Sequence, residues 1–322
     1  MRKKILFFLF AVLSALTMTT TSCSSDDDDN GFGSSSAGLL DDELRLRSVG
    51  NISFYYDEDG RLDYIHTSRG NYNFSYNPGK ITTDDSDDIP SEVSYTSKGY
   101  LSSLNEKHVD EGSWGSETEI GKSSFSYDGS GHLTKVSSTY KITVVEKGEK
   151  ESYTENSTIT LTWKSDMLQK VVWDEKDDDG YRYTETWTYG YEKDYKENYF
   201  NKYCQYAPSV ANWLEDEWVE GIAYVGLFGK GPLYLPSDCD YEDVVIDDEG
   251  KKETDYRSWS SVYSFNSNGS LSYVNYNGRK YSYSYSQVES SSKKSPSWGL
   301  MLPQKEKRHS LFRSRHRLQK NK

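Results

Sequence analysis

The chain has 322 residues, of which 34% are hydrophobic, 28% charged and 15% aromatic, and its formal net charge is −13. Between Cys23 and Ser290 there are 50 acidic and 25 basic residues, which argues against nucleic acid as a partner and against adhesion to an anionic membrane surface. The length suits one large all-β domain or two small ones, and the 28 tyrosines indicate a core that is aromatic rather than aliphatic.

Residues 1–22 have the pattern of a lipoprotein signal peptide. Basic residues 2–4 precede an apolar run, Ile5 to Leu16, that is too short to span a bilayer. Small residues then lead to Cys23, although Thr20 replaces the leucine that a lipobox usually carries three residues before the cysteine. We expect cleavage before Cys23 and acylation of this residue, which would anchor the protein to a lipid bilayer. The alternative is a secreted protein with a free Cys23.

An acidic run follows the predicted lipid-attachment site. By itself such a run is typical of a solvated tether, because like charges repel one another. Placed directly after a lipidated cysteine, it resembles the export signal of Bacteroidetes-type lipoproteins, which implies transfer to the outer face of the outer membrane. We therefore expect a flexible tether over residues 23–43 and display at the cell surface, with a periplasm-facing location as the second choice. The residues of the predicted export signal are Ser25, Asp26, Asp27, Asp28 and Asp29.

A short pattern then recurs along the chain. It consists of an aromatic residue, a turn-forming residue, two spacers, Gly, one spacer and Leu, and the clearest copy begins at Tyr56. Ile52, Phe54 and Tyr56 alternate as the residues on one face of a strand do, and the Asp-x-x-Gly segment after them predicts a tight turn in which Gly60 adopts positive φ. Further copies begin at Tyr95, Tyr127 and Phe265, and shortened versions begin at Tyr76 and Trp163.

These hairpins predict the fold class. A single hairpin cannot bury its apolar face alone, so neighbouring hairpins are expected to pair edge to edge. The segment from Tyr281 to Ser286 alternates strictly between tyrosine and serine, as a strand with two different faces does. We predict one all-β domain over residues 44–290, an antiparallel meander of Tyr-rich hairpins curved into an open or closed barrel-like sheet.

The hairpin pattern lapses between Tyr189 and Tyr256. Within this stretch, apolar residues recur at near-helical intervals over residues 209–222, and Ser209 is a suitable N-cap. We predict one short helix here, which covers an edge of the sheet or plugs its interior. Glycine-rich residues 226–232 predict a turn directly after it.

Two cysteines lie outside the leader, Cys204 and Cys239. The predicted compartment permits disulfides, and a bond between these residues would close a loop of about 35 residues, worth roughly 3.5–4 kcal/mol in the chain-entropy model. The spacing alone does not decide between a disulfide and two free thiols.

The sequence carries no recognisable catalytic or metal-binding motif, so we predict no catalytic residues, no metal and no cofactor. The many carboxylates leave open a glycosidase-like pair. Tryptophans in polar surroundings are candidates for stacking on sugar rings, with core packing as the alternative for each. These candidates are Trp114, Trp173, Trp187 and Trp259.

Residues 291–322 differ abruptly from the rest of the chain. They contain ten basic residues and one acid, Glu306, without hydrophobic periodicity. Such a composition is typical of a disordered extension, and we assign it no function at this point.

The Tyr-Asp-x-x-Gly-x-Leu copies resemble the YD repeats of Rhs-type surface proteins. The chain from Leu44 to Ser286, together with the lipobox, the acidic run and the stretch from Phe228 to Pro236, is similar to a family of Bacteroidetes lipoproteins of unknown function with a porin-like fold. This resemblance implies an antiparallel meander curled toward a barrel, and it supplies no catalytic residues. A pore that spans the membrane would need an outward apolar band, which the alternation of aromatic residues with Ser, Thr and charged residues does not favour.

We therefore expect a surface lipoprotein that acts as a non-enzymatic binding or scaffold module. Its expected partners are the lipid bilayer, through the acyl anchor, and a carbohydrate or a partner envelope lipoprotein, but not nucleic acid. Two alternatives stay open, a glycan-processing hydrolase with paired carboxylates and a purely structural envelope protein.

Overall fold

The structure is a computed structural model. It describes residues 44–84, 89–112, 115–146, 148–177, 181–192, 205–214, 216–247 and 249–287. The predicted signal peptide, tether and basic tail lie outside these ranges, as do Trp114 and Cys204.

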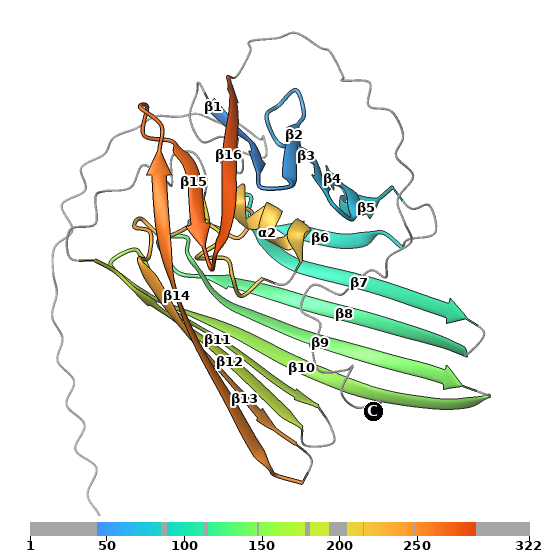
Figure 1. The fold of residues 1–322 in the computed structure, drawn as a ribbon. Helices are drawn as coiled ribbons and strands as arrows, with labels where there is room; N and C mark the ends of the chain where they lie inside the picture. The colour runs from blue at the N-terminus through green and yellow to red at the C-terminus, as the bar shows by residue number, and fades with distance from the viewer. Residues whose placement is uncertain are drawn as a thin grey trace, which may run out of the picture. The chain divides into compact units, whose positions relative to one another are not determined.

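In the described ranges the chain forms a closed barrel of sixteen strands (Figure 1). Each strand pairs antiparallel with the next one along the chain, and β1 closes the barrel by pairing with β16, where Leu44 lies opposite Gln287. The predicted all-β antiparallel meander is confirmed, and the barrel is closed rather than open. The strands are β1 Leu44–Val49, β2 Ile52–Tyr56, β3 Leu62–Thr67, β4 Gly70–Tyr76, β5 Gly79–Thr83, β6 Ser91–Tyr95, β7 Leu101–Gly112, β8 Gly115–Tyr127, β9 Leu133–Glu146, β10 Glu149–Lys164, β11 Met167–Asp177, β12 Arg182–Gly190, β13 Asp238–Ile246, β14 Lys252–Phe265, β15 Leu271–Tyr276 and β16 Arg279–Gln287.

The turns of the four full copies are present and share one geometry, whereas the shortened copies differ: the turn after Tyr76 has a cis Asn77–Pro78 peptide, and the turn after Trp163 has positive φ at Ser165 and Asp166. Between β2 and β3, Asp57 N donates to Arg61 O at 2.8 Å and Gly60 N donates to Asp57 O at 3.0 Å. Gly60 has a φ of 81°, a conformation that side-chain-bearing residues rarely adopt, which explains the glycine in the pattern. The same pair of backbone bonds closes the turns at 96–100, 128–132, 247–251 and 266–270.

Three tyrosines that precede turns, and Tyr285 near the end of β16, share a structural task. The ring of each packs against the core, and its hydroxyl donates to the backbone carbonyl of a leucine. A buried ring therefore keeps its hydroxyl satisfied without reaching water. The bonds run from Tyr56 to Leu46 (2.9 Å), Tyr76 to Leu62 (2.9 Å), Tyr127 to Leu101 (2.7 Å) and Tyr285 to Leu271 (3.0 Å).

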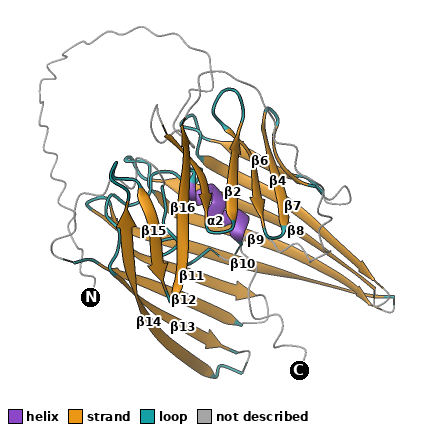
Figure 2. Ribbon diagram, turned by 45° about the horizontal axis from the view of Figure 1, so that its top comes forward, coloured by secondary structure: helices purple, strands orange, loops and turns teal. Residues whose placement is uncertain are grey.

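Residues 205–236, between β12 and β13, fill one half of the barrel interior, and we call this segment the plug. Its helix α2, Glu217–Tyr224, lies among the strands (Figure 2). Apolar side chains of the plug pack on rings from the wall: Tyr224 on Phe54, Trp218 on Tyr72 and Phe228 on Phe125. The sequence left open whether the helical segment covers an edge of the sheet or plugs its interior, and the structure shows that it plugs the interior. In the described ranges no helix is both long and apolar enough to cross a membrane.

The helix begins later than predicted. Residues 208–213 form turns, and α2 starts at Glu217 after the N-cap residue Asp216, whose side chain makes no capping hydrogen bond. Ser209 was predicted to be the N-cap, but its hydroxyl lies 2.6 Å from the hydroxyl of Tyr263 on β14. The Ser209 hydroxyl is engaged in this contact with β14 and so does not cap a helix.

Acidic residues at the start of α2 fasten the plug to the wall. Arg69 Nη1 donates to Asp216 Oδ1 at 2.6 Å. Glu217 accepts bonds from Asn51 Nδ2 at 2.6 Å and from the backbone and hydroxyl of Ser68 at 3.0 and 2.8 Å. The carboxylates thus hold the loops after β1 and β3 against the helix.

The outer wall of the barrel is polar. Along β8–β12 the inward positions are mostly buried, and the outward positions alternate with them as exposed or half-buried residues. A barrel that spans a bilayer needs an outward apolar band about 25 Å tall, whereas serine, threonine and lysine dominate these outward positions. Examples are Lys122, Ser124 and Ser126 on β8, Lys135, Thr139 and Lys141 on β9, Thr158, Thr160 and Thr162 on β10, and Thr184, Thr186 and Thr188 on β12.

Candidate functional site

A cavity of about 590 Å³ lies where the plug meets the inner face of β12–β14 and the β15–β16 hairpin. This volume is in the range of small-molecule sites. Its walls combine buried aromatic rings with polar and charged groups. The lining residues are Trp187, Pro208, Asn212, Leu214, Glu220, Tyr241, Arg257, Ser258, Trp259, Tyr276, Asn277, Arg279 and Tyr281.

Four aromatic rings form a continuous row along the cavity. The centroid of Trp187 lies 5.5 Å from that of Tyr241, which lies 5.9 Å from Trp259, which in turn lies 5.9 Å from Tyr276. Strand register produces this row: Trp187 is opposite Tyr241, and Trp259 is one inward position farther along β14 than the partner of Tyr241, Arg257. Neighbouring antiparallel strands therefore place large rings side by side on one concave face.

The plug holds this row in place through Asn212. Its Nδ2 donates to the Tyr276 hydroxyl at 2.7 Å, and its Oδ1 accepts from the Tyr189 hydroxyl at 2.6 Å. Nδ2 also lies 3.6 Å from the sulfur of Cys239. One amide thus connects three strands and orients a ring of the cavity wall.

The charged groups of the cavity have distinct environments. Glu220 accepts a bond from the Tyr224 hydroxyl at 2.9 Å, and burial raises the pKa of its carboxyl to about 7, with further contributions from Glu217 and Asp216. Arg257 and Arg279 are exposed, so the cavity has a buried aromatic floor and a cationic rim.

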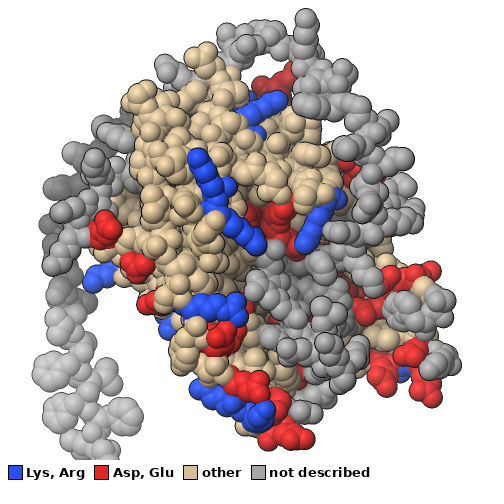
Figure 3. Space-filling view, viewed as in Figure 1, with Lys and Arg blue, Asp and Glu red and all other residues tan. Residues whose placement is uncertain are grey.

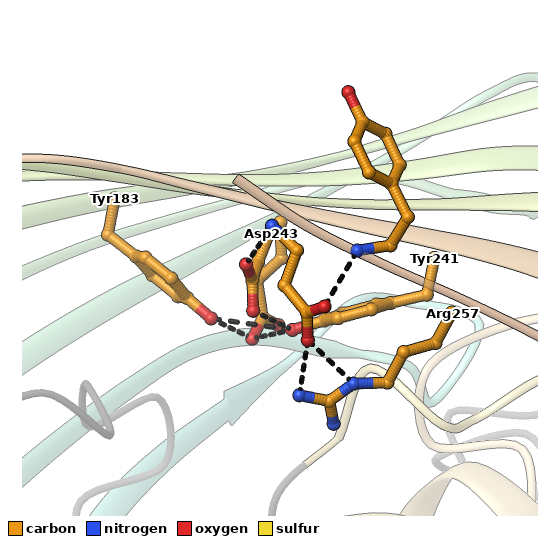
Figure 4. Close-up of polar contacts among 7 residues, drawn as sticks. Tyr183, Tyr241, Asp243 and Arg257 are labelled. Atoms are coloured by element: carbon orange, nitrogen blue, oxygen red, sulfur yellow. Dashed lines mark hydrogen bonds and ion pairs between the residues drawn. The ribbon is translucent and has the colours of Figure 1, made fainter. Parts of the chain in front are cut away.

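A polar cluster adjoins the cavity at Tyr241, as Figure 4 shows. The Tyr241 hydroxyl donates to Glu185 Oε1 at 2.8 Å and lies 3.2 Å from Asp243 Oδ2, and the Tyr183 hydroxyl donates to the same Glu185 oxygen. Burial, followed by the charge of Glu185, raises the pKa of both tyrosines far above the ordinary value, so both stay protonated donors. Arg257 bonds to Asp255 Oδ2 through two nitrogens and lies over the Tyr241 ring.

A second cavity, of about 430 Å³, lies at the turn end of the barrel. Its wall includes His132, which is stacked on Trp163 and lies 3.1 Å from Asp128 Oδ2 and 3.5 Å from Asp166 Oδ1. Although burial opposes ionisation, hydrogen bonds from His132 lower the pKa of Asp128. Lys230 N bonds to Gly131 O at 2.9 Å, so this region also joins the end of the plug to the β8–β9 turn.

The predicted stacking tryptophans have separate positions. Trp187 and Trp259 come together in the first cavity. Trp173 is 1% exposed in the core, so the expectation that it lies open to a ligand is wrong: its position on β11 points inward, where apolar neighbours cover it. Trp114 lies outside the described residues, as do the lipid-attachment residue Cys23 and the export-signal residues 25–29.

The remaining sequence candidates concern cysteine and metal. Cys239 is buried and forms no disulfide with a described residue, and burial raises the pKa of its thiol to about 12. Its proposed partner Cys204 lies outside the described residues, so the disulfide stays a prediction. Within the described ranges, no group of three or more His, Cys, Asp or Glu side chains is placed to hold a metal ion.

Sequence reasoning missed much of the first cavity. Tyr241, Tyr276, Arg257 and Arg279 carry no local motif, and only strand register brings them to one place. A usable signal is the inward alternation from Tyr183 to Tyr189, in which Glu185 interrupts a run of aromatic residues.

No protein-family model matches the chain, and a search of curated proteins finds no relative. Two solved structures resemble it, and both are described as porin-like proteins. One is from Bacteroides vulgatus (12% identity, TM-score 0.43) and one from Bacteroides uniformis (15% identity, TM-score 0.36), and each match covers 76% of this chain and 96% of the other. The lipoprotein and YD-repeat resemblances stated from the sequence remain predictions.

Proposed function

We propose that the mature protein is an outer-membrane lipoprotein that binds carbohydrate in the cavity between the plug and β12–β14, without catalysing a reaction. In this proposal Cys23 carries the acyl anchor, and the barrel stands in water at the cell surface. The row of four rings with a cationic rim is the observation that supports binding most directly.

The chemistry of the cavity suits a sugar ring. Sugars present flat C–H faces that pack on aromatic rings, and hydroxyls that need hydrogen-bond partners. The half-buried ring of Trp259 supplies the first kind of surface, and the buried ring of Trp187 belongs to the cavity floor. Glu220 and the two arginines supply the second. The rings are held by strands and by Asn212, so little ordering is needed when a ligand binds.

The polar outer wall supports a location in water rather than in the hydrocarbon of a bilayer. Threonine and lysine side chains along β9, β10 and β12 would lose hydration in lipid without gaining partners. A lipid anchor at Cys23 would then be the attachment to the membrane, as the leader predicts.

Binding can be tested with a glycan array followed by calorimetry on the best class of glycan. We expect at least one class to bind above background, and Trp259→Ala to weaken it at least 10-fold. Tyr256→Ala is the matched control, because Tyr256 lies on the outward side of the same strand and is 70% exposed. A flat array, or equal affinity of the wild type and the Trp259 variant, would refute carbohydrate binding at this cavity.

Anchoring has a separate test. Cells that express the full chain are fed labelled palmitate, and the purified protein is checked for label. We expect incorporation in the wild type and its loss in Cys23→Ser. Equal labelling of the two proteins would show that Cys23 is not the acylated residue.

A further inference from the structure

The lining of the first cavity reverses the charge of the rest of the protein. From Cys23 to Ser290 the chain carries 50 acidic and 25 basic residues, yet the charged residues that line this cavity are two arginines and a single glutamate. On the face seen in Figure 3, lysine and arginine side chains lie over the β15–β16 hairpin, whereas acidic side chains gather at the tips of β7–β10. A cavity with a cationic rim in an otherwise acidic protein attracts anions to that one place.

Strand register sets each arginine beside a ring of the aromatic row. Arg257 on β14 is opposite Tyr241 on β13, and its Cζ atom lies 5.7 Å from the centroid of the Tyr241 ring (Figure 4). Arg279 on β16 is opposite Tyr276 on β15. Opposed residues of an antiparallel pair share one face of the sheet, so both guanidinium groups stand at the edge of the same aromatic floor.

Both arginines keep hydrogen-bonding capacity for a ligand. Arg279 is exposed, it interacts with the Tyr281 hydroxyl, and it has no carboxylate partner among the described residues. Arg257 uses Nε and Nη2 to bind Asp255, and its Nη1 forms no hydrogen bond within the described part of the chain. A guanidinium group presents its N–H donors in a planar fork that suits the oxygens of an anionic group.

The single carboxyl of the lining does not cancel these charges. Burial raises the pKa of Glu220 to about 7, so near neutral pH about half of the molecules carry a proton on this carboxyl. A protonated carboxyl does not repel an anion and can donate a hydrogen bond to it. The lining is therefore cationic on balance.

We infer that the sugar bound in this cavity is an anionic one, whose carboxylate or sulfate groups meet Arg257 and Arg279 while its C–H face packs on Trp259. The inference rests on the proposed carbohydrate binding and adds the charge of the ligand to it. A neutral sugar lacks the group that a guanidinium fork binds through two parallel hydrogen bonds, so it binds more weakly. The contact is partly electrostatic and weakens as salt is added.

A glycan array probed with the full chain tests the charge of the ligand. It holds oligogalacturonides as the carboxylate set, carrageenan oligosaccharides as the sulfate set, and galactan and glucan oligosaccharides of equal length as the neutral set. We expect signal on at least one acidic set and little on the neutral set, and the set that binds identifies the anionic group. Signal on the neutral set that equals or exceeds the acidic signal would overturn this inference and leave the proposed function standing. A flat array would refute both.

Calorimetry on the best acidic glycan then tests the arginines. We expect Arg279→Gln to weaken its binding at least 10-fold, as removal of the anionic groups from the glycan does. Lys280→Gln is the matched control: it removes the same charge from the next residue of β16, whose Nζ lies 4.0 Å from the centroid of the outward Tyr273 ring. The affinity of this control should equal that of the wild type. Equal losses in the two variants would show that the overall charge, and not the cavity, attracts the glycan.

The unmodified protein gives a measurement that does not depend on the folding of a variant. In 0.5 M NaCl its affinity for the acidic glycan should fall severalfold, because salt screens the exposed guanidinium groups. Its affinity for the same glycan after carboxyl reduction or desulfation should be low at any salt concentration. An affinity that changes neither with salt nor with removal of the anionic groups would overturn the inference.

Discussion

The two halves of the barrel interior use one strand geometry for different purposes. Around the plug, inward positions carry residues such as Leu62, Ile65 and Leu101, all buried against the apolar faces of residues 205–236. Beyond the plug, the inward positions of the same sheet carry glutamate, tyrosine and tryptophan. In both halves the side chains alternate between the inward and outward faces of the strands. The halves differ in the type of residue at the inward positions: apolar residues stabilise the fold in one half, and polar and aromatic residues in the other can meet a ligand.

The boundary between the halves is the first cavity. Its floor belongs to the packed half, because Trp187, Tyr241 and Tyr276 are buried, and its rim belongs to the polar half, because Arg257 and Arg279 are exposed. A site at such a boundary has rigid walls and remains open to solvent. Substitutions on either side of it should therefore affect different properties.

The largest expected effect is on the packed half. Phe228 is fully buried and lies against Phe125 and Trp213, so Phe228→Ala leaves a cavity that its rigid neighbours cannot fill. We expect the free energy of unfolding to fall by about 3–5 kcal/mol in urea titrations. The control Phe265→Ala, at a side chain 46% exposed, should change it by less than about 0.5 kcal/mol. Similar losses in the two variants would show that the plug is not the centre of the core.

The next effect is at the boundary and depends on pH. The pKa of Glu220 is raised to about 7 in the folded protein from an ordinary value of 4.5. The folded state thus binds this proton more tightly than the unfolded chain, so Glu220 costs stability above pH 7 and this cost disappears as the pH falls toward 4.5.

Glu220→Gln should remove that cost. After allowance for the partial exposure of Glu220, we expect the variant to be more stable than the wild type by about 1–2 kcal/mol at pH 8.5 and equally stable at pH 5, in denaturant titrations at both values. A difference that does not change with pH would contradict the raised pKa. Burial also raises the pKa of Asp216 to about 6, despite the charge of Arg69. The stability of Glu220→Gln should therefore still fall as the pH rises, but less steeply than that of the wild type.

A third effect tests the hydroxyls at the turn end. Tyr127→Phe removes a 2.7 Å bond to the carbonyl of Leu101 and leaves that carbonyl buried. The expected loss is about 1 kcal/mol in thermal or urea unfolding. Tyr273→Phe is the matched control, because no hydrogen bond of the Tyr273 hydroxyl occurs among the described residues, and its stability should be unchanged. Equal effects would mean that the ring rather than the hydroxyl matters.

Local features of this fold were readable from the sequence, and distant ones were not. The turn at Asp57 to Gly60 is set by neighbouring residues, so the pattern predicts it correctly. Closure of the barrel requires Leu44 to meet Gln287, and no local signal specifies that pair. The predicted start of the helix at Ser209 was wrong for the same reason, since a tyrosine on β14 takes the serine hydroxyl.

The candidate site shows the same division. Trp187 and Trp259 were candidates because of their residue type, but their meeting depends on the register of β12, β13 and β14. Trp173 has an equally polar sequence context and is nevertheless in the core. The alternation tells which residues share a face of a strand, and only the assembled sheet tells which face is covered.

The smallest effect concerns the turns at the tips of the long strands. Gly250 has a φ of 81° with no atom within 4 Å of an added Cβ, so Gly250→Ala is opposed by backbone strain alone. We expect a loss of about 1 kcal/mol or less in unfolding free energy, because the tip can adjust. Gly129→Ala meets equally open space without a positive φ and should be neutral. The Gly250 turn has the same backbone hydrogen bonds as the turns of the recurring pattern. If the two substitutions lower the unfolding free energy equally, this turn geometry does not require glycine, and the glycine of the pattern has no physical explanation.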